Sequence, residues 1–152
     1  MFISAEEVIQ ILDLKPHPEG GAFRETYRSS VLARTDAQRS VCTAIYFLIR
    51  KDQATAWHRV KNDEIYHFYS GAPVELSLIH EDGKLSKHIL GTNVKNGERP
   101  QIIIPANEWQ SARSLGDYSL FGCTVSPGFD FSDFELIETA KLQTRYPELE
   151  LT

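Results

Sequence analysis

The chain begins and ends with helical patterns. Ser4 and Glu7 have the spacing of a capping box, in which each side chain bonds the backbone N–H of the other residue. The apolar stripe that follows at helical spacing consists of Val8, Ile9, Ile11 and Leu12. Pro16 and Pro18 end this predicted helix. A second, short helix is predicted from 139 to 146, where Pro147 stops it.

Between these helices, short apolar and alternating runs predict β-strands. Most are separated by Gly, Pro, Asn or Asp, and they cover residues 23–28, 41–49, 74–79, 85–90, 101–104, 118–125 and 134–137. The run 41–49 is apolar on both faces, which indicates a central strand covered on each side. Residues 29–38 are polar and loop-like. Many short strands with regular turn signals predict a sandwich or closed barrel.

The segment 57–71 places chemistry inside such a barrel. His58 and Val60 share one face of a strand, because side chains alternate with period two. Residues 61–63, Lys-Asn-Asp, form a turn. Glu64, Tyr66 and Phe68 then share one face of the returning strand. If both strands turn these faces inward, an imidazole and a carboxylate lie close together in the interior.

Composition narrows the function classes without naming one. A chain of 152 residues is most simply one domain, spanning 1–152. Its net charge is -5 with no basic run, so a nucleic acid polymer is not an expected partner. No apolar stretch reaches membrane-spanning length, and the first residues lack the pattern of a signal peptide. Cys42 and Cys123 lie in apolar runs and indicate buried thiols, which fits a cytoplasmic protein.

The spacing of His58, Glu64 and Gly71 resembles the first conserved motif of the cupins. That motif has a second His two residues after the first, where this chain has Val60. A second cupin-like motif follows at 97–110, with Pro and Asn at its Pro-x-Gly positions and Gln110 where a His ligand is usual. The residues that mark the cupin fold are therefore present, while two of the usual metal-binding histidines are replaced.

Three further segments, 15–28, 44–48 and 123–136, strengthen the resemblance to a small single-domain cupin family of unknown function. The resemblance implies an all-β, double-stranded β-helix (a jelly-roll barrel) with an N-terminal helix and a short C-terminal helix. It also implies a homodimer. It supplies no reaction, so function must be argued from the site.

Metal binding follows less readily from these positions. The two-His, one-carboxylate site of many non-haem metal enzymes needs two imidazoles. The motif positions offer His58, Glu64 and Gln110, which would be the ligands if a divalent metal binds. His67 faces the other way in a regular strand. We therefore expect no cofactor. A metal-dependent cupin enzyme is kept as an alternative after the two metal-independent functions described next.

Acid–base chemistry remains open to the interior side chains. Similarity to cupin-like sugar-nucleotide epimerases, which use a His base and a Tyr acid, implies His58, Glu64 and Tyr66 as catalytic candidates. Tyr66 is equally well explained as an aromatic that fills the barrel, and Phe68 as pocket wall. We expect a metal-independent isomerase or epimerase acting on a sugar or nucleotide-linked metabolite, or a non-catalytic protein that binds a small anionic metabolite or nucleotide.

A second group of candidates lies in the segment 17–25. The pair Gly20-Gly21 permits close approach of backbone N–H groups to a ligand, and Arg24 can bond phosphate or carboxylate. The alternative is a connection that simply needs glycine conformations. We expect His17, Arg24 and Glu25 to bind ligand together with Gln110 and Phe68, with Arg24 near the pocket mouth.

Overall fold

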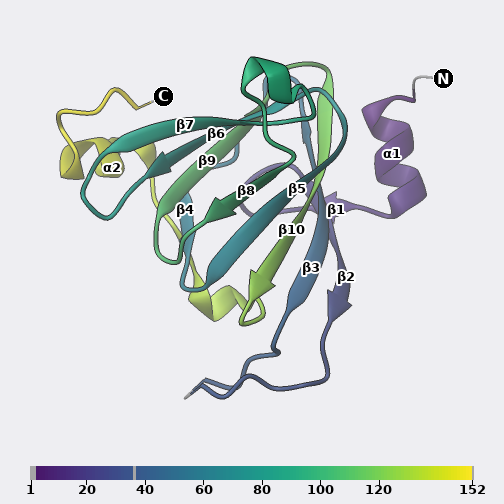
Figure 1. The fold of residues 1–152 in the computed structure, drawn as a ribbon, viewed down its shortest axis with the longest axis horizontal. Helices are drawn as coiled ribbons and strands as arrows, with labels where there is room; N and C mark the ends of the chain where they lie inside the picture. Colours follow the sequence, from purple (N-terminus) through teal and green to yellow (C-terminus); the bar gives the residue numbers. More distant parts are fainter. Residues whose placement is uncertain (1–2, 36, 152) are drawn as a thin grey trace.

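The computed structural model describes residues 3–35 and 37–151, which form two antiparallel sheets facing each other (Figure 1). The first sheet has the strand order β1 (Lys15–Pro16), β2 (Ala22–Arg28), β3 (Thr43–Arg50), β10 (Tyr118–Ser126), β5 (Asp63–Gly71) and β8 (Gln101–Ile104). The second has the order β11 (Phe134–Leu136), β4 (His58–Val60), β9 (Trp109–Ser114), β6 (Val74–Ile79) and β7 (Leu85–Leu90). This is the predicted all-β jelly-roll barrel.

The main core fills one part of the space between the sheets. Strand β3 turns Phe47 and Ile49 inward, β10 turns Phe121 inward, and β6 contributes Leu76 and Leu78, all almost fully buried. Burying a side chain of this size contributes roughly 1.5–3 kcal/mol relative to leaving it exposed. These residues hold the sheets together and leave the end of the barrel near β4 and β11 for a pocket.

Two helices cover the outer faces. Helix α1 (Ala5–Leu12) begins with the predicted capping box, and its buried Val8 belongs to a cluster with Leu14 and Leu48 on the outer side of the first sheet. Helix α2 (Thr139–Arg145) buries Leu142 in a cluster with both tryptophans on the outer side of the second sheet. Short 3-10 turns occupy Val94–Asn96 and Phe131–Asp133.

Strand β3, which contains most of the apolar run 41–49, is covered on both faces, as its pattern predicts. Phe47 faces the inter-sheet core and Leu48 faces α1. The pattern did not predict strand β9, whose sequence Trp-Gln-Ser-Ala-Arg-Ser lacks β-branched residues and regular alternation. Pairing with β6 along its whole length forms this strand. In the described part of the chain, no helix combines the length and the apolar character needed to cross a bilayer.

Candidate functional site

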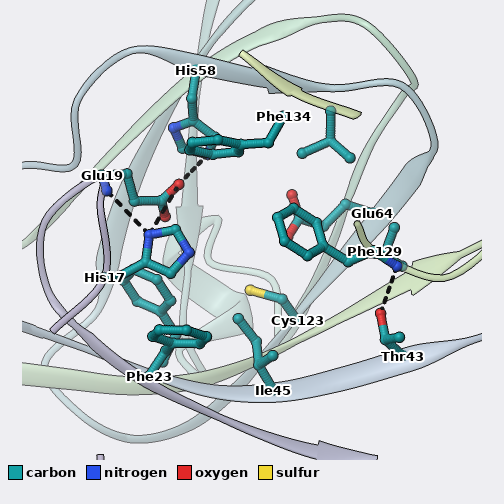
Figure 2. A pocket seen from close by; sticks show the side chains of 13 residues that line it. His17, Glu19, Phe23, Thr43, Ile45, His58, Glu64, Cys123, Phe129 and Phe134 are labelled. Carbon is teal, nitrogen blue, oxygen red and sulfur yellow. Dashed lines mark hydrogen bonds and ion pairs between the residues drawn. The ribbon is translucent and has the colours of Figure 1, made fainter. Parts of the chain in front are cut away.

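One end of the space between the sheets is a pocket (the inter-sheet pocket) with a cavity of about 40 Å³ (Figure 2). A cavity of that size holds roughly three water molecules. Its polar wall consists of His17, Glu19, Thr43, His58, Glu64 and Cys123, and its apolar wall of Phe23, Ile45, Phe47, Val60, Val125, Phe129 and Phe134. The pocket therefore combines two carboxyls and two imidazoles with aromatic rings.

Strand alternation brings His58 and Glu64 to this pocket, as the sequence predicts. His58 and Val60 are both buried and both line it, while Arg59 between them faces outward over Trp109. Glu64 enters from β5, where it pairs with Ile104 and Val125 across the sheet. The pocket thus joins the first sheet to the second at the ends of β4 and β5.

A tight turn adds a carboxylate that the sequence reasoning did not single out, Glu19. The His17 N–H donates to the Gly21 carbonyl (3.1 Å) and the Gly20 N–H to the His17 carbonyl (3.0 Å). Both glycines have positive φ, 103° and 76°, so the pair serves the connection. The Ala56 N–H then donates to the Glu19 carbonyl at 2.7 Å, which ties this turn to the segment before His58.

His58 is held at both ring nitrogens. Nδ1 lies 2.7 Å from the Ala56 carbonyl oxygen and Nε2 lies 2.9 Å from Glu19 Oε2. Because a carbonyl oxygen only accepts, Nδ1 carries a proton, and a carboxylate at Nε2 requires a second one. Burial is the largest single influence and lowers the pKa of His58, but Glu19, the Ala56 carbonyl and Glu64 together raise it above its ordinary value. The pair is an imidazolium beside a carboxylate.

His17, in contrast, is neutral. Its Nδ1 accepts the Glu19 backbone N–H at 3.1 Å, so it carries no proton, and the 3.9 Å approach to Glu19 Oε2 is not an ion pair. Burial lowers the pKa of His17, although the Glu19 charge opposes this. The proton of the ring therefore sits on Nε2, on the side of the ring that faces Cys123 in Figure 2. No hydrogen bond from the described residues reaches Nε2, although the side chain is only 5% exposed.

Glu64 is the second titrating group. Its Oε1 accepts a bond from Gln110 Nε2 at 2.9 Å, and Tyr66 donates its hydroxyl to Gln110 Oε1 at 2.7 Å. Burial raises the pKa of Glu64 to about 7, although the Gln110 bond and the His58 charge lower it. Burial and the charges of Glu64 and Glu19 hold the pKa of the Cys123 thiol well above its ordinary value. Near neutral pH, Glu64 is therefore present in both its protonated and its ionised form.

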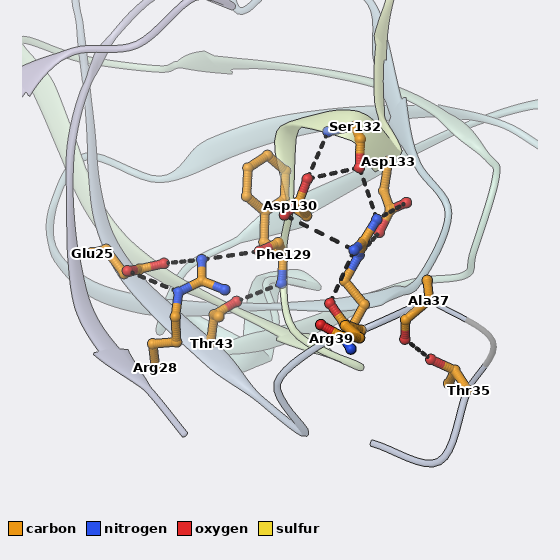
Figure 3. Close-up of polar contacts among 11 residues, drawn as sticks. Glu25, Arg28, Thr35, Ala37, Arg39, Thr43, Phe129, Asp130, Ser132 and Asp133 are labelled. Atoms are coloured by element: carbon orange, nitrogen blue, oxygen red, sulfur yellow. Dashed lines mark hydrogen bonds and ion pairs between the residues drawn. The ribbon is translucent and has the colours of Figure 1, made fainter. Parts of the chain in front are cut away.

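A segment at the pocket mouth, residues 127–134, supplies two of the aromatic side chains that line the pocket, Phe129 and Phe134. The Phe129 N–H donates to Thr43 Oγ1 at 2.9 Å and its carbonyl accepts from Arg28 Nη2 at 3.0 Å (Figure 3). Arg39 then bonds both carboxylate oxygens of Asp133, at 2.8 and 3.1 Å. These contacts, made from β2, β3 and the loop between them, hold Phe129 and Phe134 against the cavity.

The donor set at the cupin metal positions does not fit a transition metal. Val60 offers no donor atom, both nitrogens of His58 are engaged, and both ends of the Gln110 amide are hydrogen-bonded. Among residues 3–35 and 37–151, no group of three or more His, Cys, Asp or Glu side chains is arranged to hold a metal ion. The chemistry of the pocket is therefore argued from its acid–base groups alone, and the absence of a bound metal remains a prediction for metal analysis of the purified protein.

The structure separates the remaining candidates. Gln110 lies behind Glu64, and Tyr66 behind Gln110, stacked on Phe121. Phe68 packs against the main core, so none of these three lines the pocket. The expectation that Arg24 lies near the mouth is wrong, because the side chain alternates to the other face of β2 and donates to the Leu12 carbonyl at 3.1 Å.

Glu25 also lies outside the pocket lining, in an exposed ion pair with Arg28 at 2.6 Å. Sequence reasoning missed Glu19, Cys123 and Phe134 as parts of the site. Glu19 had a usable signal, since it stands between His17 and the glycine pair. For Cys123 the inward position follows only from the register of β10 against β5, which pairs it with Tyr66.

The two facing antiparallel sheets, with a pocket built from the first-motif His and Glu, define a cupin. The chain belongs to the cupin family described as "Cupin superfamily (DUF985)", whose model matches residues 6–137. It is similar to the solved protein SO0799 of Shewanella oneidensis, at 36% identity and a TM-score of 0.90, covering 97% of this chain and 92% of that one.

Two other proteins are similar along most of the chain. A hypothetical protein from Leishmania major is 32% identical with a TM-score of 0.91, covering 96% of this chain and 94% of that one. The uncharacterized protein YML079W of Saccharomyces cerevisiae (strain ATCC 204508 / S288c) is 26% identical, over 89% of this chain and 76% of that protein. None of these descriptions states a reaction.

Proposed function

We propose that this cupin binds a small molecule in the inter-sheet pocket and catalyses metal-independent proton transfer on it, as isomerases and epimerases do. The observation that carries the proposal is the buried carboxyl of Glu64, which lines the cavity and has a pKa of about 7. A general base is most effective when its pKa lies near the working pH. The cavity size favours the reactive end of a sugar-like hydroxycarbonyl compound over a whole nucleotide.

The groups around the cavity can be assigned roles for such a substrate. The carboxylate of Glu64 takes the proton from the carbon beside the carbonyl, and the electron pair of that C–H bond moves toward the carbonyl oxygen. The Nε2–H of His17 faces the cavity and donates to that oxygen as its charge develops. The Glu64 carboxyl, protonated by this step, then returns a proton to the same carbon or to its neighbour, while the imidazolium of His58 stays bonded to Ala56 and Glu19 and supplies positive charge beside the cavity. Tyr66 and Gln110 position Glu64 from behind.

Solvent exchange tests this proposal. Glycolaldehyde and dihydroxyacetone are incubated with the protein in D₂O near pD 7.5, and loss of the proton beside the carbonyl is followed by ¹H NMR. We expect exchange faster than in buffer, and a fall of about 100-fold or more in Glu64→Gln, as for removal of a general base. Glu148→Gln makes the same chemical change at an exposed site and should not alter the rate. Equal rates in wild type, Glu64→Gln and buffer would overturn the catalytic role.

A second candidate function is binding without turnover. It is favoured by the tight engagement of His58, whose two N–H groups are both held by the protein and are not free to act on a ligand. In that case ligands would occupy the pocket while the exchange rate stays at the level of buffer. The same samples therefore distinguish the two functions.

A further inference from the structure

We propose that the inter-sheet pocket selects small amino alcohols or amino carbonyl compounds, with the ammonium group toward its carboxyls and rings and the oxygen toward His17. This inference rests on the proposed small-molecule site and names its ligand class. It departs from the anionic ligand that Arg24 suggested at the level of sequence.

The charges around the cavity favour a cation. Glu19 and Glu64 both line the cavity, and as whole residues they are only 9% and 7% exposed. Within the described ranges no Lys or Arg lines it, and the one cationic side chain, His58, is already paired with Glu19. An anionic ligand would lose its hydration here and meet two carboxyl groups without a free cation. A cationic ligand would meet the free oxygens of the same groups.

The aromatic side chains of the pocket also favour a cation. Phe23, Phe47, Phe129 and Phe134 surround the polar groups. The last two belong to a cluster with Phe131 in which ring centroids lie 5.0–6.0 Å apart in edge arrangements. The face of an aromatic ring attracts cations, and rings combined with carboxylates are a recurring arrangement for ammonium ligands. The rings hold no donor that would favour an anion.

His17 fixes the other end of the ligand. Its side chain is only 5% exposed, and its Nε2–H faces the cavity without an acceptor among the described residues (Figure 2). A ligand that supplies an acceptor oxygen to this donor gains a hydrogen bond in a poorly hydrated pocket. The pocket thus presents one donor on one side and carboxyl acceptors on the other. An oxygen and an ammonium group joined by two carbons match this arrangement and the small cavity.

Three probes of nearly equal size test the proposal: ethanolamine, ethylene glycol and glycolate, which share a hydroxymethyl end and carry charges of +1, 0 and −1. Each is titrated into ¹⁵N-labelled protein at pH 7.5, and shifts of the Val60, Glu64 and Cys123 amides are followed by NMR. We expect ethanolamine to bind at least about tenfold more tightly than ethylene glycol, in line with a charge interaction in a poorly hydrated site. Glycolate should give no saturable shift.

Two variants assign the preference to the pocket. Glu64→Gln should remove most of the ethanolamine preference, while Glu148→Gln keeps it. Phe129→Leu preserves an apolar wall without a ring and should weaken ethanolamine by about threefold or more while sparing ethylene glycol, as for loss of a cation–π contact. Glycolate binding as tightly as ethanolamine, a preference unchanged in Glu64→Gln and Phe129→Leu, or no binding of any probe would overturn the proposal. Ethanolamine has no carbonyl and cannot undergo the exchange reaction, so its binding is judged independently of catalysis.

Discussion

At the scale of single residues, the environment of each titratable group decides what it can do. His17 and His58 lie on the same pocket and differ in charge, because one accepts a backbone N–H at Nδ1 and the other donates to a backbone carbonyl from the same atom. The raised pKa of Glu64 has the same kind of local cause, burial without a free cation beside it. The residue types alone do not predict these states.

The two thiols provide a test at this scale. Cys123 is buried and its pKa is raised well above the ordinary value, while Cys42 is only half-buried. Because the thiolate is the reactive form, iodoacetamide at pH 8 should label Cys42 in the folded protein and leave Cys123 unlabelled. Peptide mass spectrometry after a time course checks this. Equal labelling of both thiols before unfolding would contradict the described burial of Cys123.

At the scale of elements, the sequence predicts most of the fold. Periodicity and capping residues identify both helices and most strands, because these signals are local. Strand β9 escapes prediction because its pairing with β6, rather than its own residues, forms it. Regular strand alternation likewise predicts the inward positions of His58 and Glu64. Residues that join the site only because distant segments meet are not predicted. Glu19 reaches His58 only through a bond between two turns, and Phe134 only through the pairing of β11 with β4.

The turn that carries Glu19 makes a second prediction. A Cβ at Gly21 would lie 2.7 Å from Phe47 Cε1 and 2.8 Å from the Leu48 carbonyl oxygen, at a φ of +76°. Gly97 has a φ of +89° with nothing within 4 Å of an added Cβ, so it is the matched control. Gly97→Ala should cost about 1–2 kcal/mol for the left-handed backbone. Gly21→Ala should cost about 1–3 kcal/mol more from overpacking.

Denaturant unfolding measures both free energies. Gly21→Ala should also weaken ligand binding in the pocket, since the displaced turn holds Glu19 against His58. A Gly21→Ala protein as stable as Gly97→Ala would contradict the close packing of this turn against Phe47 and Leu48.

At the scale of the whole molecule, the buried Glu64 links stability to pH. Its pKa is about 7 in the folded protein and near 4.5 when exposed, so the folded state binds the extra proton. Its favourable contribution is complete below about pH 4.5 and is lost as the pH rises to 7, by roughly 3 kcal/mol. The raised pKa of His58 acts in the same direction above its ordinary value. Urea unfolding from pH 5 to 8 should show falling stability, with a shallower fall in Glu64→Gln and an unchanged fall in Glu148→Gln.

The homodimer expected from the sequence remains a prediction, and the edge of the first sheet at β2 is where we expect the two copies to meet. Strand β2 has five exposed residues in succession, among them Tyr27 at 55% exposed, and the loop that follows exposes Val31 and Leu32 to 62% and 61%. Its outer edge is covered only by the two residues of β1. A strand whose outer edge is mostly unpaired, beside exposed apolar side chains, favours pairing with a second copy. We expect a dimer in sedimentation velocity, and a monomer when Val31 and Leu32 are both changed to Glu. Leu115→Glu, at an equally apolar but distant position that is 46% exposed, should remain dimeric. A monomeric wild type would contradict this prediction.

The proposed function depends above all on Glu64, a buried carboxyl with a pKa of about 7 inside the inter-sheet pocket. The most direct test is a ¹³C NMR titration of protein labelled at the side-chain carboxyl carbon of glutamate, from pH 3 to 9, on wild type and Glu64→Gln. We expect one glutamate resonance with a midpoint at about pH 7, absent from the Glu64→Gln spectrum and shifted to lower pH when ethanolamine is bound. A Glu64 resonance that titrates in the ordinary range near 4.5, or that does not respond to ethanolamine, would contradict this expectation.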